Sequence, residues 1–192
     1  MKRTGLLAGV VLILLLAGCA SGQKGGEVAY YDLEAARQAP RPLPFLRTVE
    51  VVAPSWLDSG ALQYRLNFDD AARRHAYSRS RWTAAPAELL EQLLKRNLLG
   101  DGTTGQCRLR LELEEFEQVF DSPTLSRGVI EARASLYVGQ GRAPLARQSF
   151  ALSRPAASAD ASGGIKSLGT TAGDLVQGLG SWLGPDLARQ CQ

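Results

Sequence analysis

The chain has 192 residues, of which 45% are hydrophobic and 21% are charged, and its formal net charge is +3. This length suits a single domain of ordinary size with its own hydrophobic core. So small a charge gives no electrostatic reason to expect nucleic acid as a partner. Two of the three net positive charges come from Lys2 and Arg3, at the start of the chain.

The first 18 residues have the pattern of a secretory signal peptide. Two basic residues precede an uncharged stretch of 13 residues, 6–18, which is too short to cross a bilayer core of ~30 Å. The stretch ends in Leu16-Ala17-Gly18-Cys19, which matches the bacterial lipobox. We predict cleavage between Gly18 and Cys19, diacylation of the Cys19 thiol and acylation of the new amino terminus, with palmitate among the chains. Removal of residues 1–18 would leave 174 residues with a formal charge of +1.

Several acyl chains would hold the protein to a membrane far better than one. Ala20, rather than Asp, follows the cysteine and favours passage to the outer membrane. The alternatives are a signal-anchor helix, or a signal peptide with a cysteine beside it by chance. Residues 19–27 are small and polar and read as a lipidated flexible tether. Residues 28–192 then form the folded domain.

Short strand patterns fill the first half of this domain. Residues 28–33 are a strand candidate, and the prolines at 40, 42 and 44 make the next segment an extended connector. Alternating hydrophobicity predicts strands at 45–53, 62–68 and 77–82. Between them, we expect a loop at 54–60 and a charged, exposed segment at 69–74.

The clearest helix is predicted over residues 86–99. Pro86 suits the first helical position, and Gly100 follows the last turn. A single apolar stripe runs along it at helical spacing. Its members are Leu89, Leu90, Leu93, Leu94 and Leu98.

A long strand pattern follows, in which Leu109, Leu111 and Leu113 alternate with charged residues. The phase slips at Glu114-Glu115, which predicts a bulge and turns Phe116 and Phe120 inward. Further strands at 128–138 and 145–152 complete an antiparallel meander, and residues 165–183 fit an amphipathic helix. The order of elements predicts a single α+β domain. We expect a mostly antiparallel sheet, with the Leu-rich helix and the C-terminal helix packed on it.

No pattern of catalytic or metal-binding residues emerges. His75, the one histidine, stands beside Arg73 and Arg74 and is predicted to be solvated. Residues 100–105 lack the Lys-Ser/Thr of a phosphate loop and read as a turn. The carboxylates at 112–117 alternate with apolar residues and are balanced by Arg108 and Arg110, as on the wet face of a sheet. We therefore predict a protein that is not an enzyme, with no metal site and no cofactor.

Two pairs of residues remain as candidate sites. Cys107 and Cys191 would form a disulfide in an oxidising compartment, and two free thiols are the alternative. Trp56 and Leu57 lie in the Pro54-Ser-Trp-Leu-Asp58 loop. An exposed Trp56 could contact a partner or a lipid surface, whereas a buried Trp56 would cap the core, and the buried state is the one we expect.

Several stretches together resemble one family. After the lipobox come Tyr30-Tyr31-Asp32-Leu33, Val52-Ala53-Pro54-Ser55-Trp56-Leu57-Asp58 and Leu62-Gln63-Tyr64-Arg65-Leu66. Trp82 then precedes the Leu-rich helix, and the stretch from Leu109 to Pro123 and the strand to Val138 complete the pattern. The chain is similar to the ABC-type transport auxiliary lipoproteins, which include the Pqi-type lipoproteins.

The resemblance implies a non-enzymatic lipoprotein on the periplasmic face of the outer membrane of a Gram-negative bacterium. Its partners would be an Mce-domain periplasmic protein and an inner-membrane ABC transporter, which together move phospholipids or related hydrophobic molecules. Lipid binding by the domain itself, and a homo-oligomer around a conduit, stay open. The alternative function is that of an outer-membrane assembly lipoprotein, acting as chaperone or plug for a β-barrel partner.

Overall fold

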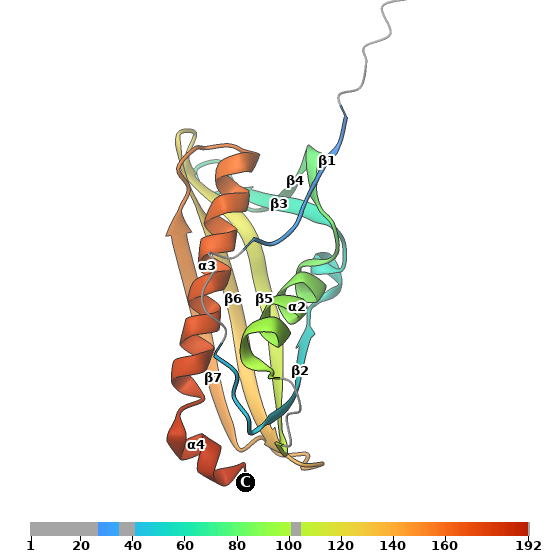
Figure 1. Cartoon of the computed structure of the whole chain (residues 1–192). Helices are drawn as coiled ribbons and strands as arrows, with labels where there is room; N and C mark the ends of the chain where they lie inside the picture. The colour runs from blue at the N-terminus through green and yellow to red at the C-terminus, as the bar shows by residue number, and fades with distance from the viewer. Residues whose placement is uncertain (1–26, 35–40, 101–104, 192) are drawn as a thin grey trace, which may run out of the picture.

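The 16-residue strand β5 (Cys107–Ser122) has partners on both of its edges and organises the sheet (Figure 1). The computed structural model describes residues 27–34, 41–100 and 105–191. The predicted signal peptide, the lipidation site Cys19 and the tether up to residue 26 lie outside the described residues, and so does most of the predicted turn at 100–105.

The described part of the chain forms one domain of seven strands and a few helices. Its strands are β1 (Ala29–Tyr31), β2 (Leu46–Val52), β3 (Ala61–Leu66), β4 (Asp70–Trp82), β5, β6 (Leu125–Val138) and β7 (Ala146–Pro155). The helices are the 3-10 helix η2 (Ser55–Leu57) and the α-helices α2 (Pro86–Leu98), α3 (Ala161–Trp182) and α4 (Pro185–Gln190).

Two short strands lie end to end along one edge of β5. β2 pairs with its first half in parallel, from Leu46 opposite Cys107 to Val52 opposite Glu112. β3 pairs with its second half, also in parallel, at residues 64–66. On the other edge, β6 and then β7 follow in the predicted antiparallel meander. The α+β prediction is confirmed, and the parallel pairings of β1, β2 and β3 make the sheet a mixed one.

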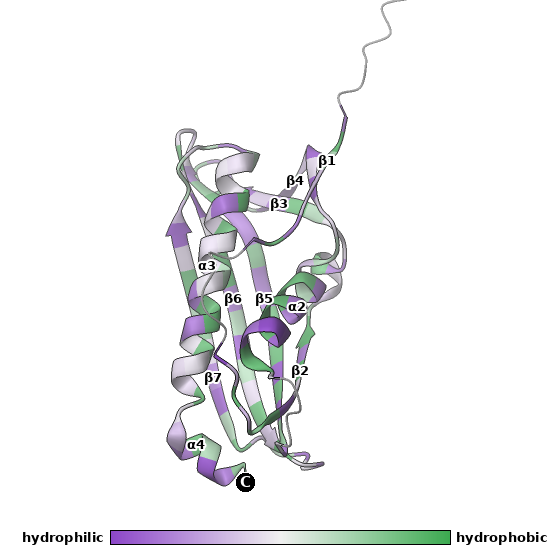
Figure 2. Ribbon diagram, viewed as in Figure 1, coloured by the Kyte–Doolittle hydropathy of each residue, from purple (hydrophilic) through white to green (hydrophobic). Residues whose placement is uncertain are grey.

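Helices α2 and α3 cover one face of the sheet (Figure 1). Hydrophobic and hydrophilic residues alternate along the strands, as the period of two requires (Figure 2). The predicted bulge is present between Leu113 and Glu115, and Leu113 and Phe116 on either side of it are both 1% exposed. The predicted leucine stripe of α2 is buried in the same core, at Leu89, Leu90, Leu93, Leu94 and Leu98.

Helix α3 lies unusually close to β6 because glycine is present at the contact. A Cβ on Gly128 of β6 would come within 2.7 Å of the backbone nitrogen of Leu168. The Asp160 side chain caps the helix by accepting a hydrogen bond from the Gly163 N–H at 2.8 Å. Sheet packing and this cap therefore hold a helix whose glycines weaken its intrinsic propensity.

Two elements differ from the sequence prediction. β4 begins at Asp70, so the segment 69–74, predicted to be merely charged and exposed, is mostly strand and contains the half-buried Arg74. Strand pairing with β3 and ion pairs with β5 hold it in place. Helix α4 is also additional, since its six residues are too few to show a clear helical period.

Candidate interaction surface

Trp56 lies on the helix η2, in the connection between β2 and β3. These strands pair with β5 up to Glu112 and again from Gln118, so the connection passes the middle of β5. Trp56 is 53% exposed, whereas its neighbour Leu57 is 1% exposed. The expectation of a buried Trp56 is therefore wrong. Leu57 is the residue that fills the core here, and its burial removes it as a partner contact.

Neighbouring side chains hold Trp56 from two directions. The Gln63 side-chain amide donates a hydrogen bond to the Trp56 carbonyl at 2.6 Å. The Arg74 guanidinium carbon lies 5.9 Å from the centroid of the indole ring, a distance suited to a cation–π contact. The Leu57 N–H also donates to the Pro54 carbonyl, which closes the 3-10 turn. An exposed aromatic ring is thus presented in one orientation.

Two arginines and two glutamates form what we call the charge cluster: Arg65 of β3, Arg74 of β4, and Glu115 and Glu117 of β5. Arg74 bridges both carboxylates, at 2.7 Å to Glu115 and 3.1 Å to Glu117. Arg65 does the same, at 3.0 Å and 2.7 Å. The four charges cancel, and each carboxylate is bound by two arginines.

The burial of this cluster was not predicted. Glu117 is 3% exposed, although its alternation with apolar residues indicated a wet sheet face. The expected partners were Arg108 and Arg110. Arg110 lies near Glu112 and Glu50, and Arg108 donates to the Gly139 carbonyl, so neither reaches Glu115 or Glu117. Partners from β3 and β4 replace them because the sheet brings three strands together at this point.

The pKa of Glu117 is raised above its ordinary value of 4.5. Burial is the main cause and the Glu115 carboxylate adds to it, while Arg65 and Arg74 act in the opposite direction. The folded protein therefore binds this proton more tightly than the unfolded chain does. The contribution of Glu117 to stability is then largest below pH 4.5 and decreases as the pH rises through the raised pKa.

We expect Glu117→Gln to remove this pH dependence. The variant has no carboxyl that can ionise at this position, so its stability relative to the wild type should improve as the pH rises from about 4.5 through the raised pKa. Urea unfolding between pH 4 and pH 8 measures the difference. Glu114→Gln, at the exposed pair with Arg133, is the matched control and should leave the slope unchanged. A constant difference between Glu117→Gln and wild type would contradict the raised pKa.

His75 is not the solvated surface residue that was predicted. Its ring stacks on Tyr64 with 5.0 Å between centroids and an interplanar angle of 15°. Tyr77 lies 4.6 Å from Tyr64, donates a hydrogen bond to Gln118 Oε1 at 2.9 Å, and has a pKa raised by burial. Gln118 in turn donates to Ser126. We interpret this row of rings as packing between β3, β4 and β5.

The charge cluster and the aromatic row do not have the arrangement of an active site. Each cluster carboxylate is held by two guanidinium groups, so its oxygens are engaged in ion pairs within the cluster. Within the ranges that the structure describes, no group of His, Cys, Asp and Glu side chains could hold a metal ion. None of the helices described there is long and apolar enough to span a bilayer.

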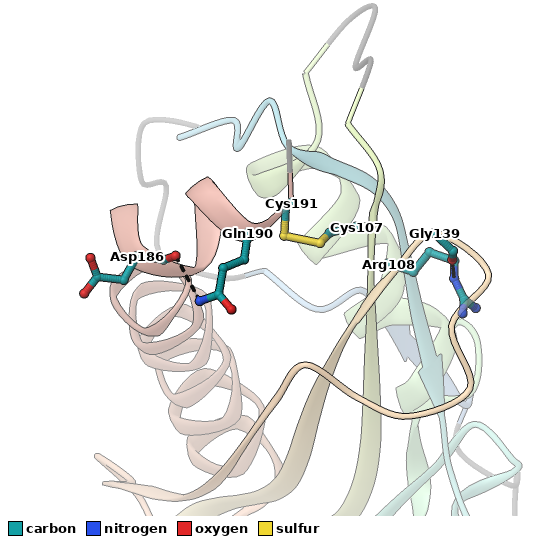
Figure 3. Close-up of a disulfide and its surroundings, with 6 residues drawn as sticks. All are labelled: Cys107, Arg108, Gly139, Asp186, Gln190 and Cys191. Atoms are coloured by element: carbon teal, nitrogen blue, oxygen red, sulfur yellow. Dashed lines mark hydrogen bonds between the residues drawn. A yellow bond between two sulfur atoms is a disulfide. The ribbon is translucent and has the colours of Figure 1, made fainter.

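Cys107 and Cys191 are joined in a disulfide at the end of the sheet where β5 begins (Figure 3). The bond connects the first residue of β5 to the residue that follows α4, across 84 positions of sequence. Both cysteines are buried, at 0% and 1% exposure. Beside them, Arg108 donates to the Gly139 carbonyl at 2.7 Å and Gln190 donates to the Asp186 carbonyl at 3.3 Å (Figure 3).

A cleft of about 650 Å³ lies between α2, the connector that precedes β2, and the second half of α3. Apolar groups of Leu43, Leu98 and Val176 share its lining with polar groups that include Arg41 and Asn97. The connector is fixed to α2 there, because the Arg41 N–H donates to the Asn97 carbonyl at 3.0 Å. Nothing in the sequence indicated this cleft, since its walls come from three distant segments.

The family model of the ABC-type transport auxiliary lipoprotein component matches residues 31–179. The chain belongs to this family. The match extends from the last residue of β1 almost to the end of α3, so it covers Trp56, the charge cluster and most of the residues that line the cleft. The family resemblance inferred from the sequence is confirmed.

Solved structures share the fold of this auxiliary lipoprotein. A Xanthomonas campestris protein of family DUF330 has a TM-score of 0.67 at 18% identity, over 81% of this chain and 94% of that one. The crystal structure of an uncharacterized protein has a TM-score of 0.65 at 17% identity, over 83% of this chain and 100% of that one. No curated protein matches the sequence. Family membership indicates a bacterial envelope lipoprotein that is associated with an ABC transporter system.

Proposed function

We propose that this auxiliary lipoprotein is a non-catalytic docking subunit, anchored through Cys19 to the periplasmic face of the outer membrane. It would receive an Mce-domain protein, linked to an inner-membrane ABC transporter, and help move phospholipids or related hydrophobic molecules across the periplasm. The observation that carries the proposal is the family match over residues 31–179, directly behind a lipobox. Loss of the protein should weaken the envelope barrier.

Trp56 is the residue we propose as the central contact with the Mce-domain protein. Tryptophan and arginine are enriched among the few interface residues that carry most of the binding energy. Here Trp56 stands exposed over Arg74, while the cluster beneath it fixes the guanidinium in place. A partner would therefore meet an ordered aromatic ring and lose little conformational entropy on binding it.

The proposal is tested by crosslinking the tagged, full-length protein in intact envelopes, followed by mass spectrometry of what it captures. Recovery of an Mce-domain protein, lost in Cys19→Ser, supports the docking function. Recovery of a β-barrel protein alone would overturn it and favour the alternative of an assembly lipoprotein. A single indispensable Glu or Asp, found by mutation scanning with folding intact, would contradict the absence of catalysis.

We predict that Trp56→Ala lowers capture of the Mce-domain protein by at least about tenfold, because a central aromatic contact is typically worth ~2 kcal/mol or more. Its stability should change by less than ~0.5 kcal/mol, since the ring is mostly exposed. Tyr30→Ala, at an exposed aromatic residue of β1, is the matched control and should bind as the wild type does. Equal loss in both variants would contradict a specific role for Trp56.

A further inference from the structure

We propose that the tips of the β3–β4 and β5–β6 hairpins insert into the lipid surface that holds Cys19, so that this end of the domain always faces the membrane. The contacting residues are Phe68 and Leu125. This inference rests on the lipid anchor of the proposed function but assigns a second, independent membrane contact. The occupant of this apolar surface is a phospholipid bilayer.

Both tips expose a large hydrophobic side chain. Phe68 lies in the turn between β3 and β4 and is 48% exposed, and Leu125 opens β6 and is 57% exposed. A turn is ordinarily a place for small or polar residues. Single exposed apolar residues are common, so the position of these two relative to each other and to the anchor carries the inference.

The two tips lie side by side. Leu66, the last residue of β3, pairs with Phe120 of β5, and the Asn67 N–H donates to the Phe120 carbonyl at 2.9 Å. Two residues later, Ser122 pairs with Leu125 across the β5–β6 turn. Backbone pairing therefore fixes both tips to the same end of β5.

The chain that leads to the anchor enters at this end. The start of β1 and the turns of the two hairpins lie on opposite sides of the upper end in Figure 1, with β1 paired to residues 80–82 of β4, while α4 lies at the lower end. Seven residues lie between Cys19 and Glu27, so the eight steps of connecting chain span at most ~29 Å. β5 alone, with 16 residues, is ~50 Å long. A tether this short selects the near end of the domain for contact with the membrane.

Acidic residues limit how deeply the tips can enter. Asp69 and Asp70 follow Phe68 directly, and Asp121 lies 3.2 Å from Arg127 beside the other tip. Charged carboxylates stay in water, so the two apolar side chains can reach only the boundary between headgroups and acyl chains, ~5–10 Å into the interface. The contact orients the domain, and the acyl chains of Cys19 supply the attachment.

The test uses the full-length lipidated protein in vesicles of phosphatidylethanolamine and phosphatidylglycerol. An environment-sensitive NBD label is attached to Leu125→Cys, with Phe68→Cys as a second variant. Arg142→Cys, exposed in the β6–β7 turn at the opposite end of the meander, is the matched control. Lipids with brominated acyl chains should quench the label at 125 and 68 by more than about twofold and leave the label at 142 unchanged.

Each result decides the question. Flotation with the vesicles and no quenching at 125 and 68 would overturn this inference and leave the anchor standing. Equal quenching at 125 and 142 would also overturn it, because the domain would then lie on the membrane without a fixed end. Failure of the lipidated protein to float would overturn the anchor, and the inference with it.

Discussion

Trp82→Ala is expected to lower the free energy of unfolding by about 3–5 kcal/mol, the cost of truncating a buried tryptophan. Trp82 is 2% exposed and packs edge-on against Phe116, with 5.6 Å between ring centroids. It is the last residue of β4, pairs with Tyr31 of β1, and donates its backbone N–H to the Gly60 carbonyl. Its loss would leave a cavity where three strands meet.

Urea unfolding measures this effect, and Trp56, in the connection between β2 and β3, offers a matched control. Among the described residues, the Trp82 Nε1 has no hydrogen-bond partner, so the whole cost is one of packing. Trp56→Ala removes a side chain of the same kind from an exposed position and should cost less than ~0.5 kcal/mol. Similar losses in the two variants would show that Trp82 is less buried than the structure indicates.

Removal of the Cys107–Cys191 disulfide should cost about 2–4 kcal/mol of stability. The bond closes a loop across 84 positions, and opening it gives the unfolded chain many more conformations. The double variant Cys107→Ala and Cys191→Ala leaves no free thiol at this site. We expect its thermal midpoint to fall, and α4 to become more open to hydrogen exchange than α2.

A reducing agent provides the internal control for this prediction. It should lower the stability of the wild type towards that of the double variant and have no effect on the variant itself. A wild type that is insensitive to reduction under unfolding conditions would show that the cysteines are not joined in the purified protein.

The elements with strong periodicity were predictable. Helix α2 follows the sequence prediction to within one residue, because its leucine stripe, Pro86 and flanking charges all agree. The meander of β5, β6 and β7 was predictable for a similar reason, since alternation marks each strand and short turns join them. Even the bulge at Glu114 could be read from a slip in that alternation.

The pairing of distant strands could not be read in the same way. Alternation shows that β2 and β3 exist, but it does not show that both lie in parallel along one edge of β5. The charge cluster depends on that pairing, and so do the burial of Glu117 and the exposure of Trp56. Lipidation of Cys19 and its cleavage site at Gly18 stay predictions of the sequence pattern.

The central position of β5 also governs when the nascent chain can fold. A polypeptide emerges amino end first, yet β2 and β3 pair with a strand that begins only at Cys107. Roughly the first hundred residues must therefore wait without their sheet partner, and such long-range pairing is slow to form. Cys191 lies 84 positions after Cys107, so its bond can close only after the later strands and both helices α3 and α4 have emerged. Until then, the apolar strands of the amino-terminal half lack their sheet partner and are prone to aggregation.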